Sequence, residues 1–118
     1  ALERKQFGKP IAEFQLLQGM LADSQAEGYA AECMVMDAAR RRDNGEQVNM
    51  IASCSKLFAT EMVGKVADRA LQIHGGLGYM EDYPVARFYR DVRLFRLYEG
   101  TSQVQQTIIA RNLFRDKI

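Results

Sequence analysis

Two long stretches of helical periodicity, separated by a short turn, constrain the fold of this chain most strongly. In the first, apolar or small residues recur three, four or seven positions apart, the spacing of one helix face, at Ile11, Phe14, Leu17, Leu21, Gly28, Ala31, Val35 and Ala38. In the second, the same spacing joins Ile51, Ser55, Phe58, Met62, Val66, Ala70 and Ile73. Residues 11–42 and 47–73 are therefore expected to form two helices, the first about 48 Å long, folded into an antiparallel hairpin.

The ends of both helices carry recognisable start and stop signals. Pro10 suits a first helical turn, and the sequence RRRDNG at residues 40–45 places cations and an Asn-Gly stop at the C-terminus. The second helix is expected to stop at His74, before three glycines in residues 75–78. Residues 1–5 read like a helix already under way, so the sequence is expected to be a fragment of a longer protein.

The remaining residues predict two shorter helices. Pro84 can open one that runs to Phe95, and Thr101 or Ser102 can cap a last one that includes Leu113. No segment shows sustained alternation with a period of two, so the fold class is expected to be all-α, an antiparallel up-and-down helical bundle. Its apolar stripes are wider than these residues can cover, which predicts cover from a parent chain or a symmetry mate.

Composition excludes several classes of function. The 118 residues are 47% hydrophobic and 26% charged, which is typical of globular proteins. A net charge of +1 gives no bulk attraction to nucleic acid or to a membrane surface, and no apolar run approaches the roughly 18 residues of a membrane span. The two cysteines, Cys33 and Cys54, are too few for a disulfide framework, and two buried thiols in a reduced, intracellular setting are the preferred interpretation.

The glycine-rich segment HGGLG at residues 74–78 is the first candidate for chemistry. It is not a dinucleotide-binding fingerprint, because the third glycine is missing and a helix, not a strand, precedes it. Helix termination is one interpretation. The other is that the absent Cβ atoms let a ligand or another subunit lie against the backbone. His74 is the only histidine, and no metal site is expected.

Arginines recur every third residue in the segment after Pro84, at Arg87, Arg90, Arg93 and Arg96. The preferred interpretation is a solvated helix face, and the alternatives are an anionic ligand or a subunit contact through paired guanidinium groups. A nucleic-acid interface is not favoured, because acidic residues balance the charge and aromatic residues are not interleaved as stacking platforms.

Glu99 lies in a break between two expected helices, in the sequence YEGTSQ of residues 98–103. Considered alone, it is best explained as an acid that stabilises the following helix N-terminus. The functional interpretation is a carboxylate that becomes a useful general base when it is partly desolvated on such a loop.

Several of these segments, in this order and with this spacing, resemble one family. They are RKQFGKPI at residues 4–11, Phe14-Gln15, QIHGGLGY at residues 72–79, Tyr83-Pro84, Arg90-Asp91 and YEGTSQ at residues 98–103. Together they resemble the C-terminal helical domain of acyl-CoA dehydrogenases over essentially the whole chain. In that family this bundle follows an N-terminal helical domain and a middle β-domain, and the resemblance implies that the first helix is truncated to residues 1–6.

The resemblance implies that FAD binds across a subunit interface of a homotetramer. The positions that match cofactor-contacting positions of the family are Arg4, Phe7, Ile11, Gln15, Gln72, Ile73, His74, Gly75, Gly76, Thr101, Ser102 and Gln103. Arg4 and Gln15 match positions that hold the phosphates and the adenosine end. Residues 72–76 match the stretch against which FAD of a neighbouring subunit lies, and residues 101–103 match a helix N-terminus suited to a pyrophosphate.

The resemblance also implies an activity. Glu99 matches the catalytic base and Gly100 a substrate-contacting position, so the full protein is expected to dehydrogenate an acyl-CoA thioester to a trans-2-enoyl-CoA. The implied partners are the acyl-CoA substrate, an electron-transferring flavoprotein and further copies of the chain, in bacterial cytoplasm or the mitochondrial matrix. The isolated fragment is expected to be inactive. Gln6 departs from the small residue or Thr of many members, which affects one FAD contact and not the class.

Two alternatives stay open at this point. One is an acyl-CoA oxidase, which passes electrons to oxygen. The other is a non-catalytic helical module that only oligomerises. The presence of Glu99 and of the glycines disfavours the second alternative, and nothing in the sequence separates the first from a dehydrogenase.

Overall fold

The computed structural model describes residues 1–115, and helices make up most of it. The elements in chain order are β1 (Lys5–Gln6), β2 (Lys9–Pro10), the 3-10 helix η1 (Ile11–Glu13), α1 (Gln15–Asp43), α2 (Asn49–His74), α3 (Gly76–Tyr79), α4 (Pro84–Val92), the 3-10 helix η2 (Arg93–Arg96) and α5 (Ser102–Phe114). The expected all-α helical architecture is confirmed. None of these helices combines the length and the apolar character that crossing a membrane requires.

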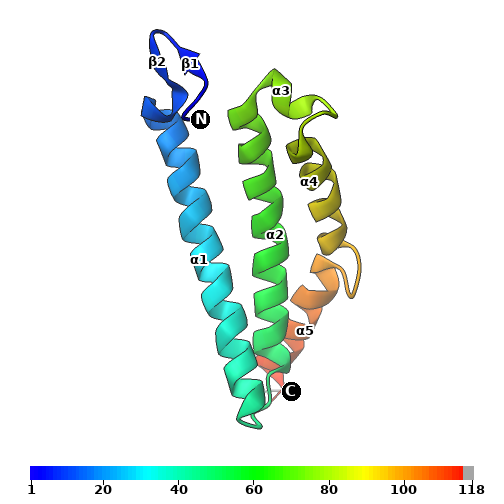
Figure 1. Cartoon of the computed structure of the whole chain (residues 1–118). Helices are drawn as coiled ribbons and strands as arrows, with labels where there is room; N and C mark the ends of the chain where they lie inside the picture. Colours follow the sequence, from blue (N-terminus) through cyan, green and yellow to red (C-terminus); the bar gives the residue numbers. More distant parts are fainter. Residues whose placement is uncertain (116–118) are drawn as a thin grey trace.

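Helix α2 is the centre of the fold. It contacts α1, which runs antiparallel to it, and also packs against α4 and against α5 (Figure 1). The molecule measures 61 × 26 × 24 Å, with a radius of gyration of 18.1 Å. A compact chain of this length has a radius of gyration of about 13 Å, so the bundle is markedly elongated.

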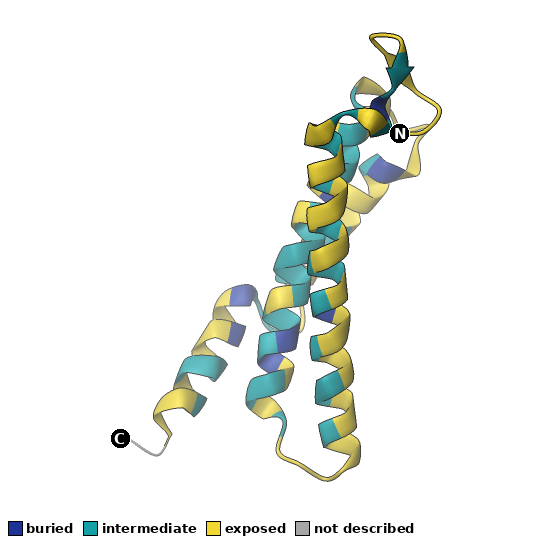
Figure 2. Ribbon diagram, turned by 90° about the vertical axis from the view of Figure 1, so that its left-hand side faces the viewer, coloured by how far each residue is buried: buried dark blue, intermediate teal, exposed yellow. Residues whose placement is uncertain are grey.

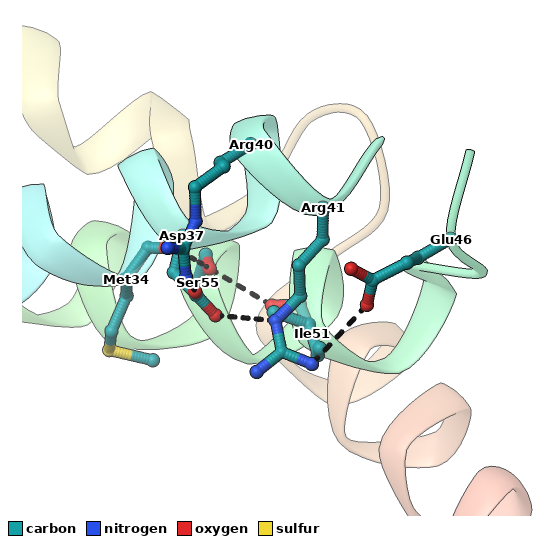
Figure 3. A network of polar contacts seen from close by, with 7 residues as sticks. All are labelled: Met34, Asp37, Arg40, Arg41, Glu46, Ile51 and Ser55. Carbon is teal, nitrogen blue, oxygen red and sulfur yellow. Dashed lines mark hydrogen bonds and ion pairs between the residues drawn. The ribbon is translucent and has the colours of Figure 1, made fainter. Parts of the chain in front are cut away.

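The turn between α1 and α2 confirms the predicted stop signal. Gly45 has a φ of +80°, its backbone N–H donates to Arg42 O at 2.9 Å, and the N–H of Glu46 donates to Arg41 O at 3.0 Å. These two bonds make the Schellman motif that ends many helices at a glycine. The Arg41 guanidinium also lies 2.8 Å from Asp37 and 3.6 Å from Glu46, so one side chain joins the last turn of α1 to the link (Figure 3).

The buried residues of the two long helices are all small. Ala31 of α1 and Ser53, Ser55 and Ala67 of α2 are buried. The Ser55 hydroxyl lies 2.9 Å from Ile51 O in its own helix and 3.1 Å from Met34 O in α1, so it can donate to either carbonyl (Figure 3). Small side chains let helix backbones approach closely, and here they leave little room for a large apolar core.

Most of the predicted apolar stripe is not covered by this chain. Leu21, Val35 and Phe58 are 46%, 49% and 37% exposed, and no large side chain among residues 1–115 is fully buried. Figure 2 shows exposed and partly exposed residues along the length of the helices, with only short buried patches. The expectation that these residues cannot cover their own stripes is therefore confirmed.

The expectation of a helix at residues 1–6 is wrong. Residues 5–10 form a two-stranded antiparallel hairpin in which Lys5 pairs with Pro10 and Gln6 with Lys9. The two turn residues, Phe7 and Gly8, have φ values of +52° and +81°. A two-residue turn with both central residues in the left-handed region matches the twist of a β-hairpin, and it cannot belong to a right-handed helix.

The start of the first long helix also differs from the expectation. Ile11 and the next two residues form η1, and Phe14 is extended, with φ −86° and ψ 127°, so α1 begins at Gln15. The Phe7 ring meets the Phe14 ring edge-on, with 6.2 Å between ring centroids, and Lys9 Nζ lies 4.5 Å from the Phe14 centroid. Phe14 therefore packs on the hairpin and does not continue the helix.

The remaining predicted boundaries are close to those observed. Helix α2 ends at His74, and Pro84 occupies the first turn of α4. Thr101 caps α5 by accepting a hydrogen bond from the Val104 N–H at 3.3 Å. Two details differ from the expectations: the glycine segment continues as the one-turn helix α3, and Cys33 is exposed instead of buried, although both cysteines are free.

Candidate functional site

The predicted site residues fall into two groups at different levels of α2. The first, which we call the glycine cluster, lies where α1 begins and α2 ends and comprises Arg4, Phe7, Ile11, Gln15 and residues 72–76 (Figure 1). The second, the Glu99 loop, is residues 98–103 and lies against Lys56 of α2. Lys56 and His74 are 18 positions apart on one helix, which corresponds to about 27 Å.

Arg4 connects the hairpin to the end of α2. Its Nη1 donates to His74 O at 3.2 Å and lies 3.5 Å from the position that a Cβ on Gly75 would take. The Arg4 carbonyl accepts from the Ile11 N–H at 2.9 Å, which fixes the Arg4 backbone against η1. Arg4 remains exposed, so its other guanidinium donors are available to an anion.

The three glycines of residues 75–78 have three different environments. Gly75 ends α2 with φ +64° and ψ −147°, a conformation that favours glycine. Gly78 is buried, and a Cβ there would lie 2.7 Å from His74 Cβ and 2.9 Å from Leu71 O. Gly76 is exposed, has no positive φ, and a Cβ there would meet nothing within 4 Å. Helix termination and packing therefore explain Gly75 and Gly78, but not Gly76.

The other members of the glycine cluster are open to solvent. Phe7 is 92% exposed, Gln15 and Gln72 are exposed, and Ile73 is half-buried. The His74 ring nitrogen Nδ1 lies 2.8 Å from Ala70 O, a hydrogen bond within its own helix. Within residues 1–115, no three His, Cys, Asp or Glu side chains gather as metal ligands would.

The Glu99 loop has an unusual backbone. Glu99 has φ +52° and Gly100 has φ +86°. A residue with a side chain in this region is strained by about 1–3 kcal/mol and persists only where its surroundings hold it. A Cβ on Gly100 would lie 2.7 Å from Gln105 Nε2, so any side chain there would displace Gln105 as well as strain the backbone. Glu99 itself is exposed, and the expected desolvation of its carboxylate is not provided by residues 1–115.

Two side chains that the sequence analysis did not single out hold this loop. Lys56 Nζ donates to Phe95 O at 3.3 Å, to Tyr98 O at 3.0 Å and to Gly100 O. Gln105, which is buried in α5, donates from Nε2 to the Glu99 and Gly100 carbonyls at 3.3 Å each. A signal was available for Lys56: no acid occupies the positions three or four residues before or after it on α2.

Glu61 of α2 fixes the start of α5. Its Oε1 accepts from Ser102 Oγ at 2.6 Å and from Arg96 Nε at 2.8 Å. The hydrogen bond from Ser102, followed by the contact with Arg96, holds the pKa of Glu61 below its usual range despite partial burial. Of the arginine series, Arg87, Arg90 and Arg93 are exposed, whereas Arg96 forms this ion pair.

The N-terminus of α5 is a possible anion site directly after Glu99. The first N–H groups of a helix have no partner within it, and they carry partial positive charge. In α5 the Val104 N–H is taken by Thr101 Oγ1, which leaves the backbone N–H groups of Ser102 and Gln103. The Ser102 hydroxyl already donates to Glu61, so only the Ser102 backbone can serve a ligand, while the Gln103 side chain is exposed.

Comparison with known proteins gives consistent results. The family described as acyl-CoA dehydrogenase, C-terminal domain, matches residues 1–114. A 3-(aryl)acrylate reductase of Clostridium sporogenes is 49% identical over 98% of this chain and 30% of its own length. The CarC subunit of the caffeyl-CoA reductase-Etf complex of Acetobacterium woodii is 47% identical over the same shares.

Solved structures agree in fold. Butyryl-CoA dehydrogenase from Megasphaera elsdenii matches with a TM-score of 0.94 and 38% identity, over 97% of this chain and 30% of that one. The chain thus spans about a third of the length of the relatives it matches. With residues 1–114 matched by one family and the fold shared with a member of it, the chain belongs to the acyl-CoA dehydrogenases, as their C-terminal helical domain.

Proposed function

We propose that this chain is the C-terminal domain of a longer FAD-dependent enzyme that dehydrogenates an acyl-CoA thioester to its trans-2-enoyl-CoA, with Glu99 as the base. The observation that carries the proposal is the Glu99 loop. It places an exposed carboxylate on a backbone held by Lys56 and Gln105, directly before the N-terminus of α5. A base and an anion-binding helix end are thereby only a few residues apart.

The described residues fit FAD, on which members of this family depend. Arg4 offers exposed guanidinium donors, Gly76 offers open backbone that no described residue fills, and α5 offers backbone N–H groups suited to a pyrophosphate. Because the glycine cluster and the Glu99 loop are about 27 Å apart along α2, we assign them to two different FAD molecules. In that arrangement Arg4 and Gly76 serve the cofactor of a neighbouring subunit, which requires an oligomer.

The chemistry divides between cofactor and chain. FAD, when bound, supplies the acceptor for the hydride that leaves the β-carbon. The Glu99 carboxylate takes the proton from the α-carbon, and the electron pair of that C–H bond becomes the new double bond. No described residue accepts from the Glu99 backbone N–H, so this group is available to the thioester carbonyl, where negative charge develops. Gly100, the residue after Glu99, is the proposed substrate-contacting position and would act through its backbone, because a Cβ there would point at Gln105.

The reverse reaction is the second candidate. The two relatives described above bear the names of reductases, at 49% and 47% identity. In that direction Glu99 delivers a proton to the α-carbon of an unsaturated thioester, so the same residues serve both reactions. Flavin bleaching by a saturated acyl-CoA measures the dehydrogenase direction. Reoxidation of the reduced flavin by a 2-enoyl or 3-arylacryloyl thioester measures the reductase direction.

The partners and setting of the full protein are also proposals. The exposed apolar side chains of the long helices support a homotetramer, with the middle domain of the parent chain as further cover. An electron-transferring flavoprotein is the proposed redox partner, because one relative is named as a subunit of a reductase-Etf complex. Bacterial cytoplasm or the mitochondrial matrix is the proposed location, and we expect the isolated domain to be inactive.

The test is the substitution Glu99→Gln in the full-length holoenzyme. The glutamine amide is nearly isosteric with the carboxylate, and the substitution keeps the backbone N–H. FAD and acyl-CoA should therefore still bind, while flavin reduction slows by about 10² to 10⁴-fold. Anaerobic stopped-flow bleaching of the flavin measures this rate.

The matched control is Glu81→Gln, an exposed glutamate in the loop before α4, which should reduce its flavin at the wild-type rate. If Glu99 only stabilises the following helix, Glu99→Gln will lower thermal stability slightly and leave flavin reduction intact. That result would remove the proposed base.

A further inference from the structure

Lys56 holds the Glu99 loop through all the hydrogen-bond donors that it has. A lysine ammonium carries three N–H donors and no acceptor. The three carbonyl oxygens that it contacts belong to Phe95, Tyr98 and Gly100, at the end of η2 and in the loop that follows. One compact charge at the end of a flexible stem suits three converging carbonyls, which a planar guanidinium does not.

The charge of Lys56 is directed at these carbonyl dipoles alone. Among residues 1–115, no carboxylate forms an ion pair with it, whereas Arg69, Arg96 and Arg41 of the same bundle all pair with acids. Lys56 is also partly buried, so its contact with the loop is less screened than an exposed contact. The interaction is therefore specific to the loop.

The position of two of these carbonyls relates Lys56 to Glu99. Tyr98 and Gly100 are the neighbours of Glu99 on either side, and their carbonyls are both held by the one ammonium. The Tyr98 carbonyl belongs to the peptide group before Glu99, and the Gly100 carbonyl to the second peptide group after it. Holding both limits rotation of the strained Glu99 backbone between them, whose φ is +52°. The direction in which the carboxylate leaves the backbone is thereby fixed as well.

We propose that Lys56 is a positioning residue that aims the Glu99 carboxylate at the substrate by clamping the carbonyls on both sides of it. This inference rests on the proposed function, because it needs Glu99 as the reacting group. Misplacement of a reacting group by about 1 Å is enough to cost about 10²-fold in rate. Gln105 contacts the Glu99 and Gly100 carbonyls from the other helix, and so limits how far the loop moves when Lys56 is changed.

The test compares Lys56→Met with Lys65→Met in the full-length holoenzyme. Both lysines lie on α2, and Lys65 is exposed and away from the Glu99 loop. Flavin reduction is measured anaerobically at saturating acyl-CoA and expressed per bound FAD, so that loss of folded protein does not count. We expect Lys56→Met to reduce its flavin about 10²-fold more slowly, with similar substrate affinity, and Lys65→Met to match the wild type.

A double variant distinguishes positioning from a general structural role. If Lys56 acts through the Glu99 carboxylate, then Lys56→Met added to Glu99→Gln will slow the residual rate little further. If the fold-reductions in rate of the two single variants multiply in the double variant, Lys56 acts independently of Glu99, and the proposal is overturned. A wild-type reduction rate in Lys56→Met would also overturn it.

Two further outcomes keep the test decisive. If Lys56→Met does not retain FAD, Lys56→Gln replaces it, because the amide keeps two N–H donors but is shorter and uncharged. That variant should be at least tenfold slower, and a wild-type rate would again contradict the proposal. If Glu99→Gln reduces its flavin normally, the proposed function fails, whereas a slow Glu99→Gln beside a normal Lys56→Met defeats only the positioning role.

Discussion

The Glu99 loop and the glycine cluster both depend on backbone in the left-handed region, yet they are held in opposite ways. In the loop, Glu99 and Gly100 are fixed by Lys56 and Gln105 of the same chain. In the cluster, Gly76 faces open space and Arg4 keeps exposed donors. The backbone of the first region is held by side chains of the same chain, whereas no described residue fills the space beside Gly76 in the second. Substitutions should therefore affect the loop through its internal contacts and the cluster through its ligand.

The largest effect that sharpens this comparison is expected for Gly100→Ala. The new Cβ would lie 2.7 Å from Gln105 Nε2, on a residue whose φ is +86°, so the loop or Gln105 has to move. We expect flavin reduction per bound FAD to fall by about 10²-fold or more, because a shift of the loop would displace Glu99, the residue directly before Gly100.

Gly19→Ala is the control for this substitution, since a Cβ on this exposed helical glycine meets nothing within 4 Å. It should leave the reduction rate unchanged and raise the unfolding free energy slightly, by up to about 1 kcal/mol. A Gly100→Ala enzyme with the wild-type reduction rate would show that the loop tolerates displacement, and the contrast with the cluster would then be lost.

An intermediate effect is expected just after α2, where Gly76 of the glycine cluster and the neighbouring Gly78 should respond differently to substitution. Gly78→Ala places a Cβ 2.7 Å from His74 Cβ and should lower the unfolding free energy by about 1–3 kcal/mol with or without FAD. In Gly76→Ala the new Cβ meets no atom of residues 1–115 within 4 Å, so the apoprotein should be as stable as the wild type while the FAD dissociation constant rises by about tenfold.

Thermal unfolding of the apoprotein and titration with FAD measure the two effects separately. If Gly76→Ala destabilises the apoprotein and leaves FAD affinity unchanged, Gly76 has a structural role. Both the glycine cluster and the Glu99 loop would then be maintained by contacts within the chain, and the proposed difference between them would be wrong.

The same contrast explains what the sequence could predict of the fold. Periodicity and stop signals located the long helices closely, because these signals act over a few neighbouring residues: 47–73 was expected for the helix observed at Asn49–His74. The prediction of a helix at residues 1–6 was wrong, because Phe7 adopts a left-handed conformation beside Gly8 and the segment forms a hairpin. A glycine between two short polar stretches was the available hairpin signal.

Site residues followed the same rule. Glu99, Gly100 and the glycines were named because they stand in recognisable local motifs. Lys56 and Glu61 were not, because their partners lie 35 to 44 positions away in the sequence, and only the packing of α2 against the end of η2 and the start of α5 brings them together. Their role depends on tertiary contacts that neither composition nor spacing displays.

The smallest expected effect concerns Glu61, and it tests whether the support beneath the Glu99 loop is electrostatic. The hydrogen bond from Ser102 and the contact with Arg96 lower the folded-state pKa of Glu61 below its unfolded value of 4.5. This group therefore adds stability above about pH 4.5, and the contribution is lost as the pH falls through its lower folded pKa. Because the side chain of Glu61 is 32% exposed, that contribution should be less than about 1 kcal/mol.

Glu61→Gln should accordingly lower the unfolding free energy slightly at pH 7 and make it depend less steeply on pH between about 3 and 5. Denaturant unfolding of the full-length protein at a series of pH values measures both changes. The matched control is Glu13→Gln, because Glu13 is an exposed glutamate of η1. If the unfolding free energy of Glu61→Gln keeps the wild-type pH dependence, the charge of Glu61 does not contribute to its contact with Ser102. Of these two residues, only Lys56 would then support the Glu99 loop through its charge.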